Sequence, residues 1–298
     1  MPAEQDVVNK ILIVGGTHGN ESTGVFLINK WLRRPELLRR EGLKVDILIG
    51  NPQAVKANRR YLDKDLNRCF SEKVLKDDSL SGIEIQRAHQ LVEQLGPKGK
   101  CNYDLIIDLH TTTANMGVNL VLTLHDTFHH KMMAYMKKQR DDVVVTSEAE
   151  LIPDHHFLCA LANKNLIVEV GPVAQGLLNH QVIEKTEQAT YQLLDFVELW
   201  NKDAVKNLPP SIEVFEYTGK VKYPVDKNGN IVACIHESIQ NKDFISIKEG
   251  DVVFRNIMDG DIPYTGSPTY ISFINEAAYY DQNIAFCTLK KSTIKIPG

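Results

Sequence analysis

The sequence predicts an α/β protein, a mixed sheet flanked by helices, that is joined to a small C-terminal all-β domain. Up to about residue 201, apolar runs of strand length alternate with amphipathic helical stretches, as in strands linked by helical crossovers. Leu208–Pro210 then interrupts this pattern like a linker, and short alternating strands follow it. We therefore expect a first domain over residues 1–207 and a second over residues 208–298.

Composition and charge restrict the class of protein. The 298 residues carry 34 basic and 38 acidic side chains, a net charge of −4, so no general attraction to nucleic acid or anionic membranes is expected. No apolar run approaches the roughly 18–20 residues that cross a bilayer, and the N-terminus has no signal-peptide pattern. The five cysteines are scattered without a C-x-x-C pair, which predicts free thiols in a reducing cytoplasm and excludes a zinc finger.

The first unit begins with a strand at Ile11–Val14, the turn GGTHGNE at residues 15–21 and a helix at Ser22–Arg33. His18 and Glu21 stand three residues apart, and over a first helical turn such positions share one face. Zinc takes nitrogen and oxygen ligands, and catalytic zinc sites use three protein ligands plus a water. This turn therefore predicts two ligands of a divalent metal, with the third from elsewhere in the chain.

A second strand is expected at residues 43–49, before Asn51–Pro52 breaks it. The polar segment 59–68, RRYLDKDLNR, has little apolar periodicity and predicts a loop. A solvated charged loop is the ordinary interpretation of such a stretch. The alternative is an anion-binding loop, because the planar guanidinium of arginine suits carboxylates.

A helix is expected at residues 82–95 and a buried parallel strand at Tyr103–Leu109. His110 directly follows that strand, as His18 follows the first one, and ligands of open α/β sheets bind beyond the carboxyl ends of strands. His110 is therefore the candidate third metal ligand. Asp108 is placed to orient an imidazole, and a structural position at the margin of the sheet is the alternative.

Further strands are expected at residues 118–124, 143–145 and 166–170, and further helices at residues 129–138 and 179–201. The pairs His129–His130 and His155–His156 are poor metal sites, because adjacent side chains point in different directions. Glu169 lies inside an apolar strand, where a carboxylate is unfavourable unless it is paired or functional. Near a metal it would serve as a general base, and a salt bridge at the sheet edge is the alternative.

In the C-terminal unit, strands are expected at residues 212–217, 232–235, 244–247 and 269–274, with a hairpin around residues 226–229. The segment Asn275–Tyr280 ends the last of these strands. Its two tyrosines have two interpretations, simple packing or a phenol that reaches into the site.

Other enzyme classes lack their motifs in this chain. The glycines of the first turn do not have the G-x-G-x-x-G spacing of a dinucleotide site, and no G-x-x-x-x-G-K-[ST] phosphate loop occurs. No G-x-S-x-G elbow of a serine hydrolase occurs. A cysteine nucleophile stays open, although none of the five cysteines lies in a catalytic motif.

Six motifs in order along the chain give it a resemblance to one enzyme family. They are GGTHGNE from Gly15, NPQAV from Asn51, RYLDKDLNR from Arg60, DLHTTTANMG from Asp108, EVGPVAQG from Glu169 and FINEAAYY from Phe273. Together they resemble the aspartoacylase and aminoacylase-3 family, zinc deacylases of N-acyl amino acids, over nearly the whole chain. The resemblance implies a zinc carboxypeptidase-like α/β domain, a C-terminal β domain that caps the active site, and one Zn²⁺ per chain.

The resemblance also implies roles for individual residues. His18, Glu21 and His110 would hold the zinc. Glu169 would take the proton from the attacking water, and Arg60 would stabilise the oxyanion as well as contact the substrate. A fixed donor at an oxyanion contributes roughly 3–4 kcal/mol to catalysis.

For the substrate, the resemblance implies that Asn67 and Arg68 bind the α-carboxylate and that Tyr279 closes over it. One position departs from the family pattern. Aspartoacylases carry an arginine for the aspartate side chain shortly before the catalytic glutamate, and a gapless count places Cys159 there. N-acetyl-L-aspartate and an N-acetylated neutral or aromatic amino acid therefore both stay open as substrates. The residues considered as substitutes for the arginine are Lys164 and His155.

The sequence thus predicts a cytoplasmic zinc-dependent amidohydrolase that converts an N-acyl-L-amino acid to a carboxylate and a free amino acid. Its partner is this small molecule; neither nucleic acid nor a membrane is expected, and a homo-oligomer such as a dimer is left open. A zinc carboxypeptidase acting on a C-terminal peptide bond is the alternative enzyme. A non-catalytic, metal-stabilised binding module is the alternative from another class, although structural zinc sites are closed by four protein ligands.

Overall fold

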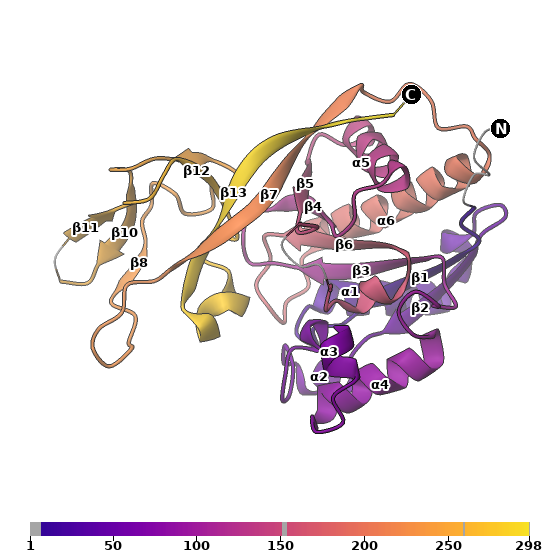
Figure 1. The fold of residues 1–298 in the computed structure, drawn as a ribbon, viewed down its shortest axis with the longest axis horizontal. Helices are drawn as coiled ribbons and strands as arrows, with labels where there is room; N and C mark the ends of the chain where they lie inside the picture. The colour runs from indigo at the N-terminus through magenta and orange to yellow at the C-terminus, as the bar shows by residue number, and fades with distance from the viewer. Residues whose placement is uncertain (1–6, 151–153, 259, 298) are drawn as a thin grey trace.

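The computed structural model describes residues 7–150, 154–258 and 260–297 (Figure 1). Its strands are β1 (Lys10–Gly15), β2 (Lys44–Ile49), β3 (Leu105–Thr111), β4 (Gly117–Leu122), β5 (Val143–Ser147), β6 (Lys164–Gly171), β7 (Ser211–Lys222), β8 (Ala233–Ile235), β9 (Ser246–Ile247), β10 (Val252–Asn256), β11 (Gly260–Pro263), β12 (Thr269–Ser272) and β13 (Ile284–Lys295). Its α-helices are α1 (Ser22–Arg33), α2 (Pro52–Ala57), α3 (Glu72–Leu75), α4 (Ile83–Leu95), α5 (Thr127–Gln139) and α6 (His180–Asn201). Short 3₁₀ turns are η1 (Pro35–Leu38), η2 (Leu66–Arg68), η3 (Leu158–Leu161) and η4 (Ala277–Gln282).

The main sheet has ten strands in the order β2-β1-β3-β6-β4-β5-β7-β13-β12-β9. Strands β2, β1, β3 and β6 are parallel to one another, and β4 runs antiparallel to β6, so the sheet is mixed as predicted. A second sheet contains β11, β10 and β8. The carboxyl ends of β1 and β3 lie next to each other, which brings together the turns that carry the predicted metal ligands.

Helices cover both faces of the main sheet, because alternate residues of its central strands face opposite sides. Ile11 and Ile13 of β1 pack into a core with α1, α5 and α6, whereas Leu12 and Val14 pack into another core with α4 and η3. Figure 1 shows α4 on the opposite side of the sheet from α5 and α6. In β3 the same alternation places Asp108 and His110 on the α4 side.

The C-terminal segment contributes strands to the main sheet. Strand β7 pairs with β5 and along most of its length with β13, so the main sheet continues into the C-terminal β region (Figure 1). The long strand β13 was not expected, and residues 226–229 form a turn closed by a single bridge between Val225 and Ile231. Among the described residues, no helix combines the length and the apolar character that crossing a membrane requires.

Candidate active site

The turn between β1 and α1 brings two of the predicted metal ligands together. The sequence suggested that His18 and Glu21 share the first turn of a helix. Helix α1 begins at Ser22, so both residues lie in the turn before the helix. The N–H of Glu21 donates to the carbonyl of His18 at 3.2 Å, which closes the turn and places His18 Nδ1 2.7 Å from Glu21 Oε1. Gly19 is required here, because a Cβ at this position would lie 2.0 Å from the carbonyl carbon of Ala54.

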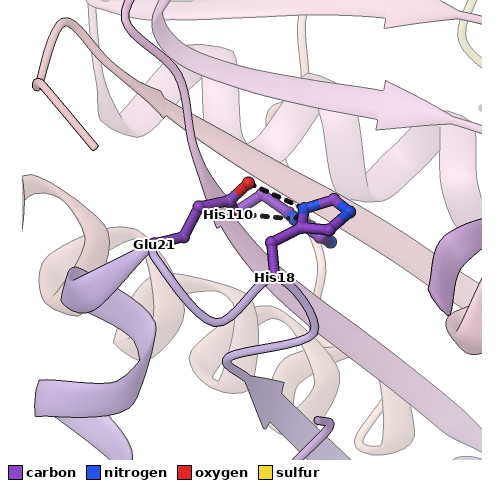
Figure 2. A group of neighbouring side chains, drawn as sticks. All are labelled: His18, Glu21 and His110. Atoms are coloured by element: carbon purple, nitrogen blue, oxygen red, sulfur yellow. Dashed lines mark hydrogen bonds and ion pairs between the residues drawn. The ribbon is translucent and has the colours of Figure 1, made fainter. Parts of the chain in front are cut away.

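Three side chains converge on one point at the end of the sheet (Figure 2). His110 Nδ1 lies 3.1 Å from His18 Nδ1 and 2.9 Å from Glu21 Oε2. All three residues are buried, and their ligand atoms lie within 4.8 Å of one another. A zinc ion with ligands at about 2.0–2.2 Å needs its ligand atoms at this kind of mutual separation.

The other nitrogen of each imidazole contacts a carboxylate. His18 Nε2 lies 2.9 Å from Asp65 Oδ1, and His110 Nε2 lies 2.9 Å from Asp108 Oδ2. Each ring can place a proton on Nε2 for its carboxylate, and with a metal ion bound the lone pair of each Nδ1 would be directed toward the common point. Such carboxylate–histidine pairs orient the histidine ligands of metal sites. The donor set therefore fits a divalent metal, with Asp108 in the orienting position that the sequence suggested.

The electrostatics of this group also call for a positive charge. Burial opposes ionisation of Glu21, but His18 and His110 outweigh it and hold the pKa of the carboxyl well below its usual range. Burial likewise opposes the charged form of His110, yet Asp108 and Glu21 outweigh it and raise the pKa of the imidazole. The shift of Glu21 reflects the two imidazoles beside it, and the shift of His110 reflects two buried carboxylates, which would also stabilise a bound cation.

The charged segment 59–68 is a fixed loop over this point and not a solvated one. Arg60 donates to Glu21 Oε1 at 3.1 Å and to Asp65 Oδ2 at 3.2 Å. The loop is held from below by the fully buried Glu84 of α4, whose carboxylate accepts the backbone N–H groups of residues 62–64 at 2.8–3.1 Å. A buried carboxylate with several N–H donors is a satisfied structural anchor, and here it fixes the position of Arg60.

Asn67 and Arg68 both line the cavity, in different environments. The side-chain oxygen Oδ1 of Asn67 accepts the N–H of Leu158 at 2.9 Å, and its Nδ2 lies 3.3 Å from Asp108 Oδ2. The amide is therefore engaged with the groups that orient His110. Arg68 donates to its neighbour's carbonyl at 2.8 Å, and its guanidinium lies 5.7 Å from the centre of the Phe157 ring, beside the cavity.

Glu169 belongs to the same cavity. The β3–β6 register pairs it with His110, so both side chains lie on one face of neighbouring strands. The cavity measures about 70 Å³ and is lined, among others, by His18, Arg60, Asn67, Arg68, His110, Glu169 and Tyr279. Burial raises the pKa of Glu169 despite the opposing effect of His110, and the carboxylates of Glu21 and Glu276 raise it further.

Glu276 was missed by sequence reasoning. It is buried, and its carboxylate accepts hydrogen bonds from the N–H groups of Thr113 at 2.8 Å and Ala114 at 3.3 Å, and from the hydroxyl of Thr112. The C-terminal region thereby fixes the loop that directly follows His110. The only sequence signal was its place in the motif FINEAAYY, three residues before Tyr279.

Cys159, at the position expected for an arginine, and its two considered substitutes, Lys164 and His155, occupy other places in the described part of the chain. Cys159 is fully buried in η3. The Lys164 ammonium lies 5.4 Å from the centre of the Phe128 ring, and the His155 ring stacks on Phe157 at 5.8 Å. The lining of the catalytic cavity includes none of these three residues.

Comparison with known proteins agrees with this geometry. Residues 7–197 match the succinylglutamate desuccinylase/aspartoacylase catalytic domain, and residues 210–291 match the AstE/AspA barrel-sandwich hybrid domain. The chain is 40% identical to a probable aspartoacylase of Nostoc sp., with 96% of this chain and 98% of the relative covered. It is 35% identical to the N-acyl-aromatic-L-amino acid amidohydrolase (carboxylate-forming) of Xenopus laevis, with 98% and 97% covered. The crystal structure of murine aminoacylase 3 superimposes with a TM-score of 0.92 at 30% identity, over 99% of each chain.

Proposed function

The chain belongs to the succinylglutamate desuccinylase/aspartoacylase family, and from that premise we propose that it is a zinc-dependent deacylase of N-acyl-L-amino acids. As a hydrolase of this family it cleaves the amide bond of its substrate to a carboxylate and a free amino acid, the reaction that relatives named aspartoacylase and N-acyl-aromatic-L-amino acid amidohydrolase support. The identity of the metal and the roles of individual residues are the parts of the proposal that go beyond the family.

One observation carries the proposal for the metal. The Nδ1 atoms of His18 and His110 and the carboxylate of Glu21 face one point, while each Nε2 contacts its own carboxylate. These three residues would hold one Zn²⁺, since nitrogen and oxygen donors in a three-ligand set are typical of catalytic zinc. A zinc ion bound there would polarise the substrate carbonyl and lower the pKa of water.

Glu169 is the proposed general base. As water attacks the carbonyl carbon of the substrate, the Glu169 carboxylate accepts one proton from the water. When the C–N bond breaks, the protonated Glu169 delivers that proton to the departing amine. A base works best when its pKa lies close to the working pH, and burial moves the pKa of Glu169 in that direction. Arg60, held at the cavity by Glu21 and Asp65, is the donor proposed for the developing oxyanion.

The remaining lining residues support recognition of the amino-acid part. Arg68 offers a guanidinium to the α-carboxylate, Asn67 lies beside it, and Tyr279 of the C-terminal region lies across the cavity. We place the catalytic domain at residues 1–207 and the capping domain at residues 208–298, so the capping domain supplies Tyr279. The free cysteines support a reducing compartment, the cytoplasm, as the place of action.

The decisive experiment replaces Glu169 by glutamine. Glu169→Gln should lower kcat on an N-acetyl amino acid by roughly 10²–10⁴-fold, the usual contribution of general base catalysis. Metal analysis should still find one zinc bound per chain. Glu184→Gln, an exposed carboxylate on α6, is the matched control and should keep full activity. Near-normal kcat in Glu169→Gln would remove this residue from the mechanism.

Two further measurements separate the alternatives. A zinc carboxypeptidase would cleave a blocked dipeptide faster than an N-acetyl amino acid. A binding module that uses the metal only for structure would unfold when a chelator removes it, and a deacylase should lose activity under the same treatment while its circular dichroism spectrum stays native.

A further inference from the structure

A second and larger cavity opens beside the catalytic one. It measures about 430 Å³ and shares Arg68, Glu148, Tyr217 and Tyr279 with the catalytic cavity. Beyond these shared residues it extends along β7 to Lys220. A ligand whose α-carboxylate lies at Arg68 can therefore direct its side chain into this second space.

The charges of this cavity are unequal. Among the described residues that line it, the cationic groups are Arg68 and Lys220, and Glu148 is the only carboxyl group. Burial lowers the pKa of His156 to about 4, which leaves this imidazole neutral near pH 7. The cavity therefore carries an excess of positive charge.

Lys220 has no anionic partner of its own. Its ammonium lies 5.9 Å from the centre of the Tyr279 ring, and among the residues described in 7–150, 154–258 and 260–297 no carboxylate forms an ion pair with it. Glu148 likewise forms no ion pair with Lys220 or Arg68, although both cations act on it through space. The volume between the two cations and Glu148 is open to a ligand.

The chemistry of the proposed substrate accounts for one cation only. An N-acyl amino acid with a neutral side chain brings a single carboxylate, which Arg68 would bind. An N-acylaspartate brings two carboxylates, separated by two carbon atoms, and the cations Arg68 and Lys220 line one cavity. A second, unpaired cation at the mouth of the same cavity is the group that such a ligand would need.

We propose that the second cavity receives the amino-acid side chain of the substrate, and that Lys220 selects N-acyl amino acids whose side chain carries a carboxylate. This inference rests on the proposed deacylase function and deepens it. It assigns side-chain selection to a lysine from the C-terminal region, in a chain where Cys159 is buried away from both cavities.

Glu148 makes this selection dependent on pH. Burial raises the pKa of its carboxyl, against the influence of Arg68 and Lys220. The neutral acid can donate a hydrogen bond to a side-chain carboxylate, whereas the ionised form repels it. The other titratable groups that face it are His156, Tyr217, Tyr279 and Cys287, and the pKa values of the two phenols and the thiol are raised by burial, so they are neutral near pH 7.

The test uses the zinc-loaded full chain and two substrates of nearly the same shape, N-acetyl-L-aspartate and N-acetyl-L-asparagine. We expect the wild-type enzyme to favour the aspartate substrate in kcat/KM. Lys220→Met should lower the ratio of the two values about tenfold, the scale of one charge-assisted contact at a partly exposed site, with the asparagine value nearly unchanged. Lys220→Arg should keep most of the preference.

Two controls make the result specific. Lys222→Met removes the charge two residues further along β7, outside both cavities, and should leave the ratio unchanged. For Glu148, the ratio in the wild type should fall as the pH rises, because the ionised carboxylate repels the acidic side chain, and Glu148→Gln should flatten this dependence. Using a ratio cancels the titration of Glu169, since both substrates need the same base.

Three results would overturn the inference: a wild-type ratio near one, an equal loss for both substrates in Lys220→Met, or faster turnover of N-acetyl-L-tyrosine than of N-acetyl-L-aspartate. In each of these cases hydrolysis of any N-acetyl amino acid still upholds the deacylase function. If no N-acyl amino acid is hydrolysed, the proposed function fails and this inference fails with it. Thermal unfolding of each variant confirms that the comparison is between folded proteins.

Discussion

The orientation of His18 depends on one carboxylate, and replacing that carboxylate is the sharpest test of the metal site. Asp65→Asn keeps the size of the side chain but removes the negative charge that lies 2.9 Å from His18 Nε2. Loss of such an orienting carboxylate weakens metal binding by roughly 10–100-fold. At about 1.4 kcal/mol per factor of ten, this corresponds to about 1.4–2.8 kcal/mol. We therefore expect the zinc Kd of Asp65→Asn to rise by that factor.

Zinc affinity is the right measurement because Asp65 also contacts Arg60. A fall in kcat alone could arise from a displaced Arg60, whereas titration of the metal-free protein against a competing chelator reports only the ligand set. Asp63→Asn is the matched control in the same loop: Asp63 accepts the N–H of Ile83 at 2.8 Å and does not contact His18. If Asp65→Asn binds zinc as tightly as the control, the orienting role of Asp65 is refuted.

Two other predictions concern the frame around the site. Glu276→Gln removes a carboxylate that raises the pKa of Glu169. Because the base must be ionised, activity falls as the pH drops through the pKa of Glu169, so the acid limb of the kcat/KM profile should move to lower pH. An acid limb that stays in place or moves to higher pH would contradict this prediction. Gly19→Ala places a methyl group 2.0 Å from the carbonyl carbon of Ala54 and should lower the free energy of unfolding in urea by about 3 kcal/mol. In the control Gly229→Ala the new methyl group meets no atom, and the positive φ should lower this free energy by about 1 kcal/mol. Equal losses in the two variants would show that the close contact at Gly19 relaxes.

The strands that carry the site were predictable because their signals are local. β1, β3 and β6 each read as apolar runs, and each occurs close to its expected position. β13 gave no such signal, since its second half is mostly exposed and rich in polar residues. β13 forms a strand because it pairs with β7 along most of its length. The two strands are far apart in the sequence, so their pairing leaves no local pattern in either segment.

The same distinction applies to the site. The proposed ligands could be named because His18 and Glu21 share a turn and His110 occurs near a strand end. Of the groups that hold them in place, Asp108 could be named, but Asp65 and Glu276 could not, because their partners are distant. Asp65 contacts His18 across 47 residues, and Glu276 binds Thr113 across 163. The motifs RYLDKDLNR and FINEAAYY contain Asp65 and Glu276, but the hydrogen bond that gives each residue its role forms only when the chain folds.

The placement of carboxylates distinguishes a catalytic centre from a structural metal site. Asp65, Asp108 and Glu84 each have defined hydrogen-bonded or charged partners, so their burial is compensated. Glu169 differs, because it lies in the cavity lined by His18 and His110, forms no ion pair among the described residues, and has a raised pKa. A partly buried carboxylate without an ion-pair partner destabilises the fold, and it is expected where a proton must be accepted during a reaction. A closed, four-ligand structural site would need neither that carboxylate nor the cavity in front of it.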